Sequence, residues 1–180
     1  TKCNKSFKSL PDAMVCTNCN DDGILDVIYD YEKIKAVFTT DYLNTNKHKS
    51  IWRYLPLLPI DSKYTEDTLR VGWTPIYKSK GLNNLLNIKQ LYIKDDGQNP
   101  TQSLKDRASV IACVKALENN YEIISCSSTG NAASSLAGNA AKLGLKTVIF
   151  VPKRAPVGKL TQLLVFGADL IKVNGDYKST

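Results

Sequence analysis

The chain lacks the features that define several common classes of protein. No apolar run in its 180 residues approaches the roughly 20 residues that a helix needs to cross a bilayer, and no secretory signal pattern opens it. The five cysteines are odd in number, and three of them fall within the first 19 residues, which argues against a complete disulfide framework. We therefore expect a cytoplasmic protein without a membrane span.

Clustered charge is also missing. The net charge is +7, yet the longest basic cluster is Lys47-His48-Lys49, and no aromatic residues interleave with basic ones. A nucleic-acid interface normally shows such a patch. We therefore expect no nucleic-acid partner and interpret the excess charge as a solvated surface, which is compatible with an anionic small molecule.

The chain divides into three zones. Residues 1–30 are polar and turn-rich, residues 31–71 resemble a linker with short helices, and residues 72–180 alternate strand and helix signals. Because the sequence begins at Thr1 inside a cysteine motif and stops at Thr180, we expect it to be a piece of a longer chain.

The third zone predicts an α/β fold, with a parallel sheet and helices on both of its faces. Ligands of such sheets bind beyond the carboxyl ends of strands, where the loops 97–105 and 127–131 are expected. The predicted strands are 90–94, 122–126, 147–151 and 169–173, and the predicted helices are 103–118, 130–143 and 157–166.

Lys105 lies where a nucleophilic amine could be placed. Ser103 or Thr101 can cap the helix that follows, which puts Lys105 in its first turn. The positive end of the helix dipole disfavours a cation there, and an amine must be uncharged to form an imine. An ordinary surface lysine is the alternative interpretation.

The second loop, Ser127-Ser128-Thr129-Gly130-Asn131, joins an apolar strand to an Ala-rich helix. Its hydroxyls and the free N–H groups of the helix start can bind a carboxylate or phosphate. A capped structural helix explains the same pattern. An imine-capable lysine together with an anion site is a rarer combination than either alone.

These segments together resemble the tryptophan-synthase-like family of pyridoxal-phosphate enzymes, also called fold type II. The resemblance covers about residues 72–175 and is nearest to the threonine-synthase branch, although Leu104 and Ala132 replace residues common in that branch. The matching segments are Gly72-Trp73-Thr74-Pro75-Ile76, Asn99-Pro100-Thr101 with Ser103 and Lys105-Asp106-Arg107, Ser127 to Ala133, Val151-Pro152, Gly158-Lys159-Leu160 and Phe166-Gly167-Ala168.

The resemblance implies that residues 72–180 are the N-terminal part of a catalytic domain that converts O-phospho-L-homoserine and water to L-threonine and phosphate. Lys105 would hold pyridoxal phosphate and move protons, and Asn131 would bind the cofactor's phenolic oxygen. Ser128, Thr129 and Gly130 would bind the anionic groups of the substrate. Lys159 would bind its phosphate or be a surface lysine. The family also allows a homodimer, and the loop for the cofactor phosphate is expected after Thr180.

The first zone resembles the zinc-ribbon-like segment of many threonine synthases. Cys16 and Cys19 have the spacing of a metal knuckle, and Cys3 lies upstream as a third candidate ligand. A cysteine before Thr1 would complete the set, whereas His48 is not expected to bind metal. Zinc binding and a degenerate, metal-free ribbon both remain open.

Two alternative functions remain. One is another reaction of the same family, either dehydration of threonine or serine or a replacement at the β-carbon. The other is a zinc-ribbon binding module attached to an inactive domain.

Overall fold

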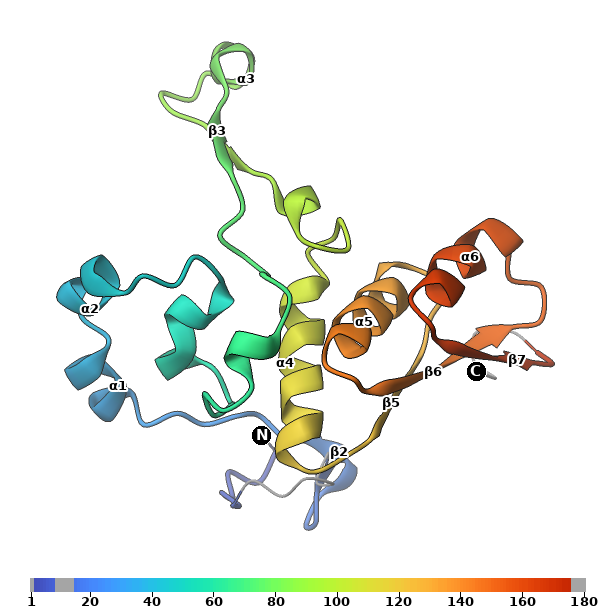
Figure 1. Cartoon of the computed structure of the whole chain (residues 1–180). Helices are drawn as coiled ribbons and strands as arrows, with labels where there is room; N and C mark the ends of the chain where they lie inside the picture. The colour runs from blue at the N-terminus through green and yellow to red at the C-terminus, as the bar shows by residue number, and fades with distance from the viewer. Residues whose placement is uncertain (1, 9–14, 176–180) are drawn as a thin grey trace. The chain divides into compact units, whose positions relative to one another are not determined.

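The structure is a computed structural model that describes residues 2–8 and 15–175. The chain forms two compact units, residues 1–44 and 45–180, and each is described here by itself (Figure 1). Within the described ranges, no helix is long and apolar enough to span a membrane.

The first unit contains a small hairpin and two short helices. In the hairpin, Val15 pairs with Ile24 and Cys16 with Asn20 in antiparallel register. Asp30 caps the first helix, because its side chain accepts a hydrogen bond from the N–H of Lys33 at 3.2 Å. The elements are β1 (Val15–Cys16), β2 (Asn20–Ile24), α1 (Tyr31–Val37) and α2 (Thr40–Thr45).

The second unit opens with a segment that packs against its longest helix, α4 (Asp106–Glu118). Trp52 and Val71 are buried against Val110 and Val114 of α4. The indole N–H of Trp52 donates to Thr68 Oγ1 at 2.8 Å. This contact holds the chain that leads to Gly72 against α4. The short helical turns of the segment are η1 (Ile51–Leu57) and η2 (Thr65–Asp67).

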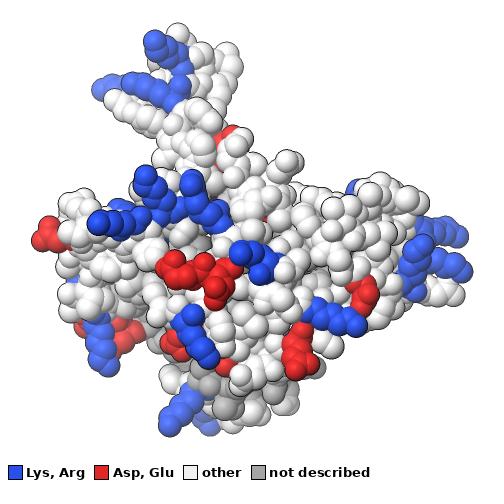
Figure 2. Space-filling model, in the orientation of Figure 1, with Lys and Arg blue, Asp and Glu red and all other residues white. Residues whose placement is uncertain are grey.

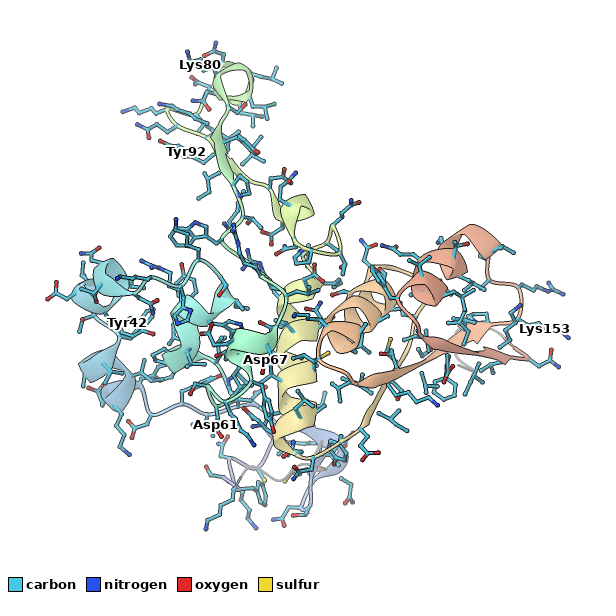
Figure 3. The ribbon with its side chains drawn as sticks, viewed as in Figure 1. Tyr42, Asp61, Asp67, Lys80, Tyr92 and Lys153 are labelled. Carbon is cyan, nitrogen blue, oxygen red and sulfur yellow. The ribbon has the colours of Figure 1, made fainter. Side chains whose placement is uncertain are left out.

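A two-stranded arm follows. β3 (Ile76–Lys78) and β4 (Tyr92–Lys94) pair antiparallel, and α3 (Lys80–Leu86) lies between them. Their residues are exposed or half-buried, and the labelled Lys80 and Tyr92 lie in the projecting part of the ribbon in Figure 3. The expectation that the strand near residue 92 joins the parallel sheet is wrong. β4 instead takes the short β3 as its antiparallel partner, although the connection between the two strands, which contains α3, is long enough for a parallel crossover.

The predicted parallel sheet is confirmed for the remaining three strands. Its order is β5-β6-β7, with Ser127 opposite Phe150 and Phe150 opposite Ile171. The predicted alternation of strands and helices is confirmed to within three residues at each end. The strands are β5 (Ile123–Ser127), β6 (Lys146–Pro152) and β7 (Asp169–Val173), and the remaining helices are α5 (Asn131–Lys142) and α6 (Val157–Val165).

The core lies between this sheet and its helices. Ile149 and Val151 of β6 are fully buried, in one cluster with Ala137 of α5 and Leu163 of α6. The opposite face carries Ile123, which is 55% exposed. Within the part of the chain that the structure describes, helices therefore cover one face of the sheet rather than the expected two.

Candidate active site

The lysine loop, residues 95–105, is tied down at its start by an ion pair. Arg107 of α4 donates from Nε and Nη2 to the two carboxylate oxygens of Asp96, each at 2.8 Å. Thr74 Oγ1 donates to the same carboxylate at 2.6 Å. The hydrogen-bonded guanidinium holds the pKa of Asp96 well below its ordinary range, and partial burial opposes this effect. The loop therefore has a rigid start.

Asn99 joins the lysine loop to the segment around Gly72. Its buried Oδ1 accepts the N–H of Gly72 at 2.9 Å, and its Nδ2 donates to the carbonyl of Asp96 at 2.9 Å. Gly72 has φ +82°, and a Cβ there would lie 3.0 Å from the backbone nitrogen of Ile51. Only glycine suits this position, which explains why it belongs to the motif.

Lys105 itself directly precedes α4. Ser103 Oγ accepts the N–H of Lys105 at 3.2 Å, which forms a turn before the helix. The expectation that Ser103 or Thr101 caps the helix is wrong, because Lys105 takes the cap position and α4 has no side-chain cap hydrogen bond among the described residues. The carbonyl of Lys105 accepts the N–H groups of Ala108 and Ser109, so it takes part in the first turn. Its side chain is exposed, and within residues 2–8 and 15–175 its amine has no hydrogen bond or ion pair. An unpaired amine on a rigid backbone can react with an aldehyde.

The predicted start of this helix at residue 103 is wrong, because α4 begins at Asp106. The preceding Gln102 has φ 59°, outside the helical region. Asp106 accepts the N–H of Thr101 at 2.8 Å, which folds residues 101–105 into tight turns instead of a helix.

The serine turn, residues 127–131, follows the carboxyl end of β5. Ser128 Oγ accepts the N–H of Gly130 at 3.1 Å, and Thr129 is buried. Asn131 is the first residue of α5 and is exposed, and no described side chain caps this helix. The start of α5 could therefore bind an anion, and this role stays a prediction.

Lys159 lies in the first turn of α6, in an exposed position. Its backbone N–H donates to the carbonyl of Pro156 at 3.0 Å, and within the described residues it makes no hydrogen bond to the lysine loop or the serine turn. Its role therefore stays a prediction.

Asp106 joins the lysine loop to α5, the helix that begins at the serine turn. Its carboxyl group is fully buried and accepts hydrogen bonds from Thr101 and from Ser135 and Asn139 of α5. Sequence analysis missed Asp96, Asp106, Ser135 and Asn139. The last two stand four residues apart in an Ala-rich helix, a spacing that could have signalled a buried polar pair.

A cavity of about 400 Å³ lies beside the Asp96–Arg107 ion pair. Tyr54 and Trp73 line it, and the guanidinium of Arg53 lies 5.1 Å from the Trp73 ring centroid. Lys105 is not among the residues that line this cavity.

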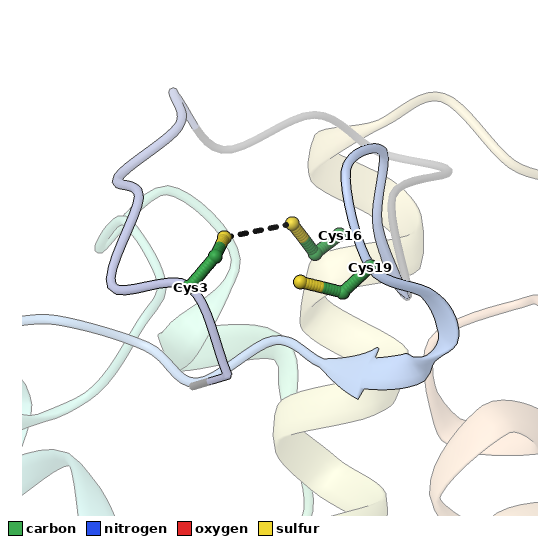
Figure 4. Close-up of side chains that lie close together, drawn as sticks. All are labelled: Cys3, Cys16 and Cys19. Carbon is green, nitrogen blue, oxygen red and sulfur yellow. Dashed lines mark hydrogen bonds between the residues drawn. The ribbon is translucent and has the colours of Figure 1, made fainter.

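The predicted metal ligands converge in the first unit. The sulfur atoms of Cys3, Cys16 and Cys19 lie within 4.8 Å of one another, and they point toward a common centre (Figure 4). The N–H of Cys19 donates to the carbonyl of Cys16 at 3.1 Å, which closes the tight turn between them. A Cβ on Gly23 would lie 2.5 Å from Cys19 Cβ, so the hairpin closes tightly over the cysteines.

The hydrogen bonds of these thiols shift the pKa of Cys3 and the pKa of Cys19 in opposite directions. A hydrogen bond from the backbone of Lys5, followed by those with Cys16 and Cys19, lowers the pKa of Cys3. The hydrogen bond with Cys3 is the main cause that raises the pKa of Cys19 to about 11. Three sulfur ligands at this spacing fit a zinc ion, which would displace the shared protons.

The surface charge agrees with the dispersed pattern of the sequence. Lys and Arg side chains lie interspersed with Asp and Glu on the face shown in Figure 2.

A lysine beside a helix start and an uncapped helix at the end of a parallel strand fit a pyridoxal-phosphate dependent enzyme. Residues 68–180 match the sequence pattern of the family described as pyridoxal-phosphate dependent enzyme. The chain belongs to this family.

Among curated proteins, the chain is similar to threonine synthases. The threonine synthase of Methanocaldococcus jannaschii is 37% identical over 98% of this chain and 43% of its own length. That of Methanosarcina acetivorans is 39% identical over 90% of this chain and 38% of its own length. The chain thus spans about two fifths of these curated relatives.

A solved structure shows the same fold. The crystal structure of cysteine synthase from Entamoeba histolytica has a TM-score of 0.55 and 26% identity, over 67% of this chain and 37% of the other. The expected α/β fold of fold-type-II enzymes is therefore confirmed.

Proposed function

We propose that the protein is a pyridoxal-phosphate dependent threonine synthase, which converts O-phospho-L-homoserine and water to L-threonine and phosphate. The observation that carries this proposal is the unpaired amine of Lys105 on a loop fixed by Asp96, Asn99 and Asp106. The names of the similar relatives support the choice of reaction.

The residues present fit the cofactor. Lys105 would hold it through an imine, and Asn131 would donate a hydrogen bond to its phenolic oxygen. The bound cofactor supplies an electron sink for negative charge at the substrate's α-carbon. Lys105 would take the proton from that carbon once the substrate amine has replaced it, and would return a proton later in the reaction.

The serine turn would bind the substrate. The N–H groups and hydroxyls of Ser128, Thr129 and Gly130 suit its carboxylate, since they lie at the positive end of α5. Lys159 would bind its phosphate. These proposed roles suit a small, doubly anionic amino acid as the substrate.

A direct assay tests the proposal. The complete protein, loaded with pyridoxal phosphate, should release phosphate from O-phospho-L-homoserine and form L-threonine. Formation of 2-oxobutanoate from threonine, without phosphate release, would instead identify a dehydratase. Ala132 favours this second candidate, because many threonine synthases have a threonine there and the Ala-Ala form also occurs among dehydratases.

We also propose that Cys3, Cys16 and Cys19 bind a structural zinc ion. The convergence of their sulfur atoms and the close approach of Gly23 support it. Metal analysis of the complete protein should find about one zinc ion per chain, and Cys16→Ser should remove it. A metal-free wild-type protein that keeps its fold would refute the zinc site.

Two further expectations concern localisation and oligomeric state. We propose that the enzyme works in the cytoplasm, because the cysteines of the structure are free thiols. A homodimer is expected, and light scattering of the complete protein measures its mass.

A further inference from the structure

The carboxyl of Asp106 accepts four hydrogen bonds. It is fully buried between the start of α4 and the middle of α5. Oδ1 accepts from Thr101 Oγ1 at 2.7 Å, Ser135 Oγ at 2.7 Å and Asn139 Nδ2 at 2.8 Å. Oδ2 accepts the backbone N–H of Thr101 at 2.8 Å. One oxygen therefore faces mainly α5, and the other faces the backbone of the lysine loop.

The surface of α5 is shaped to receive this loop. Ser135, Gly138 and Asn139 share one face of the helix, because they are three and four residues apart. A Cβ on Gly138 would lie 2.7 Å from Thr101 Cγ2. Thr101 therefore rests directly on the backbone of α5, above the Asp106 hydrogen bonds.

The hydrogen bonds of Asp106 fix the lysine loop in one position on α5. A shift of the loop would leave a buried carboxyl oxygen and buried donors without partners, and such groups are costly. Asn139 already carries an unfavourable desolvation free energy, because within the described residues its buried Oδ1 has no hydrogen-bond partner. Its amide is oriented by its Nδ2, which donates to Asp106 and to the carbonyl of Ser135.

The connection reaches both proposed cofactor contacts. Lys105 directly precedes Asp106, and Asn131 lies one helical turn before Ser135 on α5. Any change in how Asp106 holds the loop would move the amine of Lys105 relative to Asn131.

We infer that Asp106 is a positioning residue, which sets the geometry between Lys105 and Asn131 through its bonds to Thr101 and α5. The inference rests on the proposed function, since it assigns Asp106 a purpose only if Lys105 and Asn131 hold the same cofactor. A purely structural carboxyl would stabilise the unit without affecting the reactivity of Lys105.

Asp106→Asn separates these roles. The amide oxygen can keep the three bonds made by Oδ1, but the amide N–H₂ would face the N–H of Thr101, so that two donors meet. The tie to the loop is lost while the tie to α5 stays. We expect kcat to fall about 10- to 100-fold with a much smaller change in KM, since a displacement near 1 Å has this effect.

A second readout does not depend on turnover. Apoprotein is mixed with pyridoxal phosphate, treated with borohydride to trap the cofactor on lysine, and analysed by peptide mass spectrometry. Asp106→Asn should label Lys105 at least several-fold more slowly than wild type. Asp169→Asn is the matched control, because it makes the same chemical change at the exposed ion pair with Lys146, at the amino ends of β6 and β7. It should fold as wild type and leave labelling and kcat unchanged.

Gly138→Ala covers the case in which Asp106→Asn does not fold. The added methyl group displaces Thr101 and leaves Asp106 in place, so it should reduce kcat and labelling in the same direction. Thr101→Ser keeps both bonds to Asp106 and should retain activity.

The outcomes separate the two proposals. If wild-type cofactor is trapped on another lysine, the proposed function fails, and this inference fails with it. If it is trapped on Lys105 but a folded Asp106→Asn or Gly138→Ala protein matches wild type in kcat and labelling, only the positioning role is refuted.

Discussion

Asp96 and Arg107 form a two-point ion pair that closes the lysine loop onto α4, with both N–O distances at 2.8 Å. The pair joins the first residue of η3 (Asp96–Gln98) to a residue of the first helical turn. Both side chains are less than one third exposed, so solvent screens the interaction only in part.

This pair makes stability depend on pH in the acid range. Because the folded-state pKa of Asp96 is lowered, its contribution is complete above the ordinary carboxyl pKa of about 3.9 and is lost as the pH falls below that value. Asp96→Asn should cost about 1–2 kcal/mol of unfolding free energy at pH 7. Urea unfolding from pH 7 to pH 2.5 measures this, and the difference between mutant and wild type should become smaller toward the acid end. A constant difference at every pH would contradict the assignment.

Lys105→Ala should abolish the visible absorbance of bound cofactor and the activity. The fold should stay intact, because the side chain is exposed and lacks partners within the described ranges. Absorbance, phosphate release and thermal unfolding measure the three quantities. Lys142→Ala, an exposed lysine in the last turn of α5, is the control and should behave as wild type. An active Lys105→Ala enzyme would remove the basis of the proposed function.

Gly23→Ala should lower the zinc content of the complete protein from about one ion per chain toward zero. The new methyl group would meet Cys19 Cβ at 2.5 Å and Cys16 Cβ at 2.9 Å, which forces the two cysteines apart. Gly81→Ala is the matched control, since a Cβ there meets no atom within 4 Å. Zinc content equal to that of the control would show that the cysteines do not hold metal in this arrangement.

Cys113 should resist alkylation in the folded protein at pH 8. Burial raises the pKa of its thiol to about 12, so almost none of it is thiolate at this pH. Mass spectrometry after iodoacetamide should find Cys113 unmodified until denaturant is added, whereas the exposed Cys3 of a metal-stripped sample should react. Rapid labelling of Cys113 without denaturant would mean that α4 opens readily.

The local parts of the fold and site could be predicted from the sequence. β5, β6, β7 and the helices between them have strong periodic signals. The serine turn is visible because its hydrogen bond joins neighbours in sequence. The position of Lys105 beside a helix start follows from the same local signals.

The contacts between distant residues could not be predicted. Asp106 meets Ser135 and Asn139 across 29 and 33 positions, and no local pattern records such a pairing. The three residues of β3 are too few for a clear alternation, so the partner of β4 was missed. The start of α4 was misplaced for a related reason, since the bonds of Thr101 to Asp106 compete with helix formation.

The unbroken burial of α5 from Ala133 to Ala140 has an evolutionary consequence. A stretch buried on all sides leaves little space for larger side chains, and only Leu136 and Asn139 of its eight residues are larger than alanine, serine or glycine, so it should tolerate little variation. The exposed α3, by contrast, should accept many substitutions. When a library of all single substitutions is selected for growth without supplied threonine, variants at these eight positions should grow poorly.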